Sequence, residues 1–85
     1  MELKAQFDQA VAESKGLSEK PSNETLLLLY SLYKQGTEGD ASGEGPSNPF
    51  DFVAKAKHNA WGEQKGKSAT EAMTAYINLI SKLKG

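Results

Sequence analysis

The spacing of apolar residues constrains the fold of this 85-residue chain more than any other feature. Because an α-helix has about 3.6 residues per turn, apolar residues at steps of three and four share one face. Residues with this spacing are Leu3, Phe7, Ala10 and Val11 near the start of the chain, and Ala72, Met73, Tyr76, Ile77, Leu79, Ile80 and Leu83 near its end. Few segments show the period of two expected for a strand. The sequence therefore predicts an all-α fold.

Capping residues predict where the first two helices begin and end. The first helix is expected over residues 3–15, with Gly16 as its C-cap. The second is expected to begin at Ser22 or Asn23, since either side chain can accept a hydrogen bond from a free N–H group. It carries four consecutive leucines and is expected to end at Gln35, before a glycine.

Residues 36–48 are rich in glycine and small polar residues and predict a long, ordered loop. A loop of this length inside a small domain is often functional. The third helix is expected to begin with Asn48 as N-cap and Pro49 at the first helical position, and to run to about Gln64. Residues 68–71, Ser-Ala-Thr-Glu, form a capping box that opens a fourth helix.

The composition predicts one domain, residues 1–85, in a reducing compartment. The chain has no cysteine, so disulfides and thiolate metal sites are excluded. Its start lacks the apolar stretch of a signal peptide or membrane span, which predicts a cytoplasmic protein without stable membrane insertion. A net charge of −1 provides no global field to attract nucleic acid. All basic residues are lysines, so contacts to anions must come from single ammonium groups.

Tyr30, Tyr33 and Lys34 are three and four residues apart and therefore share one face of the second predicted helix. Two phenol rings beside an ammonium group suit a purine nucleotide, which offers a ring for stacking and a phosphate for the charge. Two half-buried tyrosines that pack the core, with a solvated lysine beside them, would give the same spacing. The spacing alone leaves both interpretations open.

No catalytic or metal-binding group is expected. His58 is the only histidine, and a lone imidazole without cysteine or a carboxylate cluster is a poor metal site. A hydrolytic triad would need this histidine as its base and a serine placed beside it by chance. The sequence thus favours a binding protein over an enzyme and calls for no cofactor.

Several segments in the same order resemble the acyl-CoA-binding protein family. They are Phe7-Asp8-Gln9-Ala10-Val11, Leu29-Tyr30-Ser31-Leu32-Tyr33-Lys34-Gln35, Gly39-Asp40, Asp51-Phe52, Lys55-Ala56-Lys57, Ala60-Trp61, Ala72-Met73 and Ala75-Tyr76-Ile77. The resemblance spans nearly the whole chain. It implies an up-down-down-up four-helix bundle with a long loop between the second and third helices.

The same resemblance implies that the chain binds and carries medium- to long-chain fatty acyl-CoA thioesters, as a monomer that can supply acyl-CoA-using enzymes. The implied head-group site consists of Lys15, Tyr30, Tyr33, Lys34, Lys57 and Tyr76. In it, Lys34 and Tyr30 reach the 3′-phosphate region of CoA, and Tyr33 stacks near the adenine. Lys57 neutralises phosphate. Candidate residues for the acyl groove are Phe7, Leu26, Leu27 and Leu29, which could equally pack the core.

Three residues depart from the family pattern. His58 stands where the family usually has tryptophan, Gly45 where it usually has arginine, and Val53 where a lysine often assists the phosphates. We therefore expect weaker head-group binding and a stronger dependence on acyl length than in a typical member.

Two other classes of protein are alternatives to this interpretation. An acyl carrier protein needs an Asp-Ser attachment site, and the sequence contains no Asp-Ser dipeptide. A helical protein-interaction module would use Tyr30, Tyr33 and Lys34 to contact a partner protein and would bind no lipid. Titration with acyl-CoA separates this alternative from a carrier.

Overall fold

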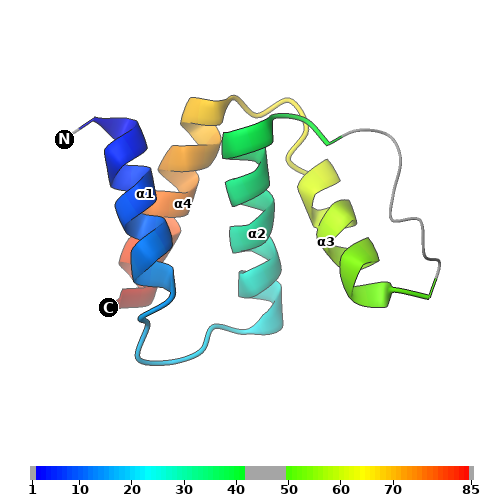
Figure 1. Ribbon diagram of the computed structural model, residues 1–85, viewed down its shortest axis with the longest axis horizontal. Coiled ribbons are helices and arrows are strands. Elements are labelled where there is room, and N and C mark those ends of the chain that lie inside the picture. Colours follow the sequence, from blue (N-terminus) through cyan, green and yellow to red (C-terminus); the bar gives the residue numbers. More distant parts are fainter. Residues whose placement is uncertain (1, 42–49, 85) are drawn as a thin grey trace.

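The computed structural model describes residues 2–41 and 50–84, and in them it confirms the all-α fold. The helices are α1 (Leu3–Ser14), α2 (Asn23–Glu38), α3 (Phe52–Gly62) and α4 (Ala69–Lys84). Figure 1 shows the expected up-down-down-up order, because α2 and α3 run in one direction while α1 and α4 run in the other. No helix of these ranges combines the length and apolar composition needed to cross a bilayer.

The core lies between α1, α2 and α4. Its buried apolar residues are Phe7, Ala10, Leu29, Leu32, Ala72, Tyr76 and Ile80, from these three helices. Helix α4 packs against both α1 and α2, whereas α3 packs against α2 alone among the described helices. None of the residues of α3 is fully buried. Helix α3 therefore stands at one side of the molecule, with apolar side chains accessible (Figure 1).

Helix α2 begins as predicted but continues further. Ser22 is its N-cap, as expected, and accepts a hydrogen bond of 3.2 Å from the N–H of Thr25. The prediction that the helix ends at Gln35 was wrong, because Gly36 is buried inside the helix against α4. The helix ends instead at Glu38, and its C-cap Gly39 has a positive φ of 83°, which glycine readily adopts.

The ends of α1 and α3 also differ from the prediction. Helix α1 ends at Ser14, and its C-cap is Lys15 rather than Gly16. Helix α3 begins at Phe52 with Asp51 as N-cap, whose Oδ1 accepts a 3.0 Å hydrogen bond from the N–H of Ala54. It ends at Gly62 and not near Gln64. The expected cap at Asn48 and Pro49, and most of the predicted loop, lie outside the described residues.

The capping box of α4 is confirmed. The N–H of Ser68 donates to Glu71 Oε1 at 3.2 Å, and the N–H of Glu71 donates to Ser68 Oγ at 3.1 Å. The first of these, from the Ser68 N–H, stabilises the carboxylate of Glu71 and lowers its pKa, with a smaller contribution from the Ser68 hydroxyl group. The start of α4 is thus fixed by local sequence.

A polar network joins the end of α2 to the connection between α3 and α4. The buried Gln35 donates through Nε2 to Asp40 Oδ1 at 2.7 Å and to the carbonyl of Lys67 at 2.8 Å. Asp40 Oδ1 also accepts from the N–H of Gly66 at 2.9 Å. These donors lower the pKa of Asp40, the Gly66 bond most of all. The network holds the C-terminal end of α3 beside the C-terminal end of α2. A further hydrogen bond joins the same two ends, since Trp61 Nε1 donates to the Gly39 carbonyl at 2.8 Å.

Candidate functional site

Two lysines and two aromatic rings meet where α2 faces α3. The ammonium group of Lys34 lies 6.0 Å from the ring centroid of Tyr30 and 5.3 Å from that of Trp61. The ammonium group of Lys57, from α3, lies 5.4 Å from the Tyr30 centroid. These are cation–π distances. Tyr30, Lys34, Lys57 and Trp61 are called the lysine–aromatic cluster below.

Among the described residues, the cluster has an excess of positive charge that is partly offset by the carboxylate of Glu38. Lys34 forms an ion pair with Glu38, one turn further along α2. The hydrogen bond to Glu38 raises the pKa of Lys34, against a smaller opposing effect of burial, so its ammonium group remains charged at neutral pH. Two lysines beside one carboxylate leave a net positive site suited to an anion.

Tyr33 directly precedes Lys34 on α2 and rests on the aromatic core. Its ring stacks on Phe7 at 5.9 Å between centroids, and Phe7 meets Tyr76 edge to face at 5.1 Å. Phe7 and Tyr76 are 1% and 4% exposed, whereas Tyr33 is 40% exposed. The two buried rings therefore support Tyr33, and Tyr33 offers the accessible aromatic surface.

The structure brings Lys15 into no contact with the cluster. Lys15 is exposed and follows α1 as its C-cap. Among the interactions found in the described ranges, none joins it to Tyr30, Lys34 or Lys57.

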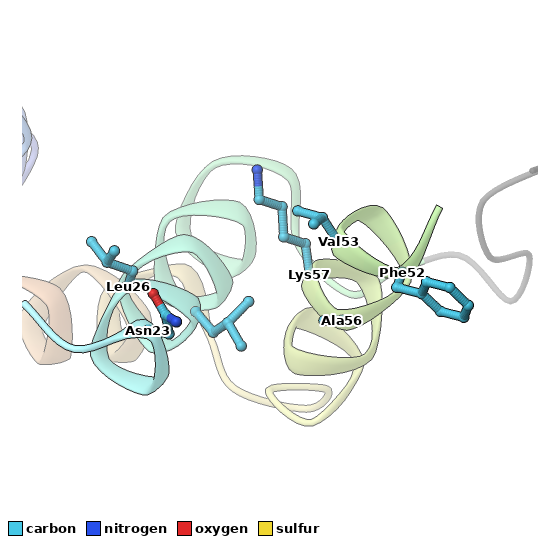
Figure 2. Close-up of a pocket in the computed structure, with 7 residues that line it drawn as sticks. Asn23, Leu26, Phe52, Val53, Ala56 and Lys57 are labelled. Atoms are coloured by element: carbon cyan, nitrogen blue, oxygen red, sulfur yellow. The ribbon is translucent and has the colours of Figure 1, made fainter. Parts of the chain in front are cut away.

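An apolar groove of about 430 Å³ lies between the first half of α2 and α3 (Figure 2). It is lined by Asn23, Leu26 and Leu27 from α2 and by Phe52, Val53, Ala56 and Lys57 from α3. Leu26 is 37% exposed, and Val53 is 66% exposed. Lys57 belongs both to this groove and to the lysine–aromatic cluster. An apolar surface and a positively charged one are therefore continuous.

The groove matches only half of the residues that the sequence suggested for it. Leu26 and Leu27 line it, but Phe7 and Leu29 are buried in the core. Phe52, Val53 and Ala56 also line the groove but were not predicted to do so. The face that α3 turns toward α2 depends on packing between segments that are distant in the sequence. The exposed apolar pair Phe52 and Val53 at the start of a helix was the available signal.

His58 lies next to the cluster but not in a metal site. Its ring approaches Trp61 edge to face, with 6.3 Å between centroids. Over residues 2–41 and 50–84, no group of three or more histidine, aspartate or glutamate side chains could hold a metal ion. Gly45, the third departure named above, lies outside these ranges.

Comparisons with known proteins agree on one family. The family described as "Acyl CoA binding protein" matches residues 4–80. The "Acyl-CoA-binding protein homolog 1" of Caenorhabditis elegans is 47% identical over 77 residues, which cover 91% of this chain and 88% of that protein. The "Acyl-CoA-binding protein" of Brassica napus is 42% identical over 83 residues, which cover 98% of this chain and 89% of that protein.

The fold also matches a solved structure from the same family. The crystal structure of Oryza sativa Acyl-CoA-Binding Protein 2 matches with a TM-score of 0.87 and 38% sequence identity, over 96% of this chain and 90% of that one. Sequence and fold thus point the same way over nearly the full length, and the chain belongs to the acyl-CoA-binding protein family.

Proposed function

We propose that this protein binds medium- to long-chain fatty acyl-CoA thioesters and carries them without chemical change. The observation that carries the proposal is the continuity between the apolar groove and the lysine–aromatic cluster through Lys57. A fatty acyl-CoA has the same two parts, a long apolar chain joined to a highly charged nucleotide. Family membership supports the same ligand.

The head group is proposed to lie over Tyr30 and Tyr33, with its phosphates between Lys34 and Lys57. The two ammonium groups approach the Tyr30 ring, so one anion placed there can contact both. Tyr33 is accessible for stacking with the adenine. Tyr76 is assigned a supporting role through Phe7, since it is buried beneath the site.

Lys15 completes the proposed head-group site on the strength of the family resemblance alone. It is exposed at the end of α1, and its long side chain can move toward a bound phosphate.

The acyl chain is proposed to lie in the groove between Leu26, Leu27, Val53 and Ala56. Each buried methylene stabilises binding by about 0.8 kcal/mol, so affinity should rise with chain length until the groove is filled. Val53 lies on this wall at a position where, by the family resemblance, a lysine often assists the phosphates. Its apolar side chain therefore favours binding of the acyl chain over binding of the phosphates.

The proposed role is that of a carrier and buffer. The protein keeps an amphipathic thioester out of membranes and releases it by dissociation to acyl-CoA-using enzymes. It acts as a cytoplasmic monomer of one domain and needs no cofactor. Binding involves no covalent step.

Calorimetric titration with CoA, octanoyl-CoA, palmitoyl-CoA and palmitate, at one salt concentration and below micelle formation, tests the proposal. Palmitoyl-CoA should bind far more tightly than CoA or palmitate, because joining the two parts makes the second contact intramolecular. Equal binding of palmitate and palmitoyl-CoA would indicate a general lipid pocket. No binding of palmitoyl-CoA would favour a protein-interaction module instead.

A further inference from the structure

Glu38 is the acidic side chain that pairs with Lys34 at the proposed phosphate site, and the proposed function gives it no role. It forms an ion pair with Lys34, whose side chain is 26% exposed while that of Glu38 is 52% exposed. We propose that Glu38 is a counter-ion that holds Lys34 in the free protein and weakens the binding of phosphate-bearing ligands. This inference rests on the proposed function of the same site.

Helix stability does not explain the position of Glu38. It is the last residue of α2, where the helix dipole favours a cation and disfavours a carboxylate. The order of the pair, with lysine four residues before glutamate, is also the less favourable one in a helix. The contacts of Glu38 therefore point to its effect on Lys34 and not to support of α2.

The surroundings of Lys34 make Glu38 a direct competitor for the ligand. The aromatic rings of Tyr30 and Trp61 already lie within 6.0 Å and 5.3 Å of the ammonium group, and Glu38 accepts one of its hydrogen bonds. A phosphate oxygen must come within about 2.9 Å of Lys34 Nζ to form a charge-assisted hydrogen bond. Glu38 must then turn away or repel the phosphate.

The charge of Glu38 should not affect binding of the acyl chain in the apolar groove. None of the residues that line the groove is Glu38 or a neighbour of it in the sequence. Removal of its charge should therefore tighten binding by the same factor for every acyl length, and the gain in affinity per methylene should not change. A change of the groove itself would alter that gain.

The test compares Glu38→Gln with a control variant, Asp8→Asn. Asp8 forms an ion pair with Lys4 on α1 at the same spacing of four residues, so the control removes the same charge from a different helix. Both variants and the original protein are titrated with CoA, octanoyl-CoA and palmitoyl-CoA at low and at high salt. Glu38→Gln should bind all three ligands about three- to tenfold more tightly at low salt, and the difference should shrink at high salt, where charges are screened. Asp8→Asn should bind as the original protein does.

The proposal is overturned if Glu38→Gln binds these ligands no more tightly than the original protein, or if Asp8→Asn gains equally. It is also overturned if the gain persists undiminished at high salt, since screening would then have no role. Urea unfolding of each variant verifies that the protein is folded. If the original protein binds palmitoyl-CoA and only the effect of Glu38→Gln is missing, the carrier function stands and the counter-ion role alone fails.

Discussion

Replacement of Gly36 by alanine should stabilise the protein, although Gly36 is buried where α2 meets α4. Glycine in a helix is less favourable than alanine by about 0.8–1 kcal/mol, because it loses more backbone freedom on folding. A Cβ atom at this position would lie 3.2 Å from Met73 Cγ, and 3.6 and 3.7 Å from the Met73 nitrogen and the Ala72 Cβ. Only the first distance is tight.

The balance of these effects gives the expected magnitude. Met73 is unbranched and partly exposed, so its side chain can shift by a few tenths of an ångström at a cost of about 0.5 kcal/mol. Subtraction from the gain in helix propensity leaves a net stabilisation of about 0.5 kcal/mol, or about 2–4 °C in Tm for a domain of this size. Gly36→Val adds two further methyl groups against α4 and should destabilise by about 1–3 kcal/mol.

Urea unfolding followed by circular dichroism measures the free energy of unfolding of each variant. In a Met73→Ala background the tight contact is absent, so Gly36→Ala should then gain the full propensity difference of about 1 kcal/mol. A loss of stability for Gly36→Ala in both backgrounds would contradict this prediction, because it would show that helix propensity does not control stability at this position.

Three further predictions concern the site and its supports. Lys34→Ala should weaken palmitoyl-CoA binding about tenfold to a hundredfold in calorimetry, a loss of about 1.5–3 kcal/mol. The control Lys4→Ala should leave the affinity unchanged. If folded Lys34→Ala binds as tightly as the original protein, Lys34 is not part of the site. Ser68→Ala should cost about 1 kcal/mol in urea unfolding, and an unchanged midpoint would contradict the role of the cap. The pKa of Asp40 is lowered by folding, so its contribution to stability is present above its ordinary pKa of 3.8 and is lost as the pH falls through the lower folded value. Asp40→Asn should therefore reduce the loss of stability between neutral and acid pH, and urea unfolding curves that keep the original pH dependence would exclude this role.

Features set by neighbouring residues were predictable from the sequence. The capping box at Ser68 and Glu71 and the N-cap at Ser22 depend on residues three or four apart, and both are confirmed. The shared face of Tyr30 and Lys34 is likewise a property of one helix. Fold class followed because the apolar spacing of α4 is unambiguous over four turns.

Features that depend on packing between distant segments were not predictable in the same way. Gly36 was expected to end α2, but its closeness to Met73 allows the helix to continue, and no residue near Gly36 signals that contact. Glu38 consequently fell in the predicted loop, and its pairing with Lys34 was missed. The approach of Lys57 to Tyr30 depends on how α3 packs on α2, for which only the family resemblance gave an indication.

The position of Trp61 gives the protein an intrinsic optical probe. It is the only tryptophan of the chain, its indole N–H donates to the Gly39 carbonyl, and the Lys34 ammonium group lies over its ring. Indole emission responds to nearby charge, so a ligand that draws Lys34 toward a phosphate will change the colour or the intensity of the fluorescence. Rapid mixing with unlabelled acyl-CoA, with selective excitation of this single indole, can then follow loading and release in real time from inside the proposed site.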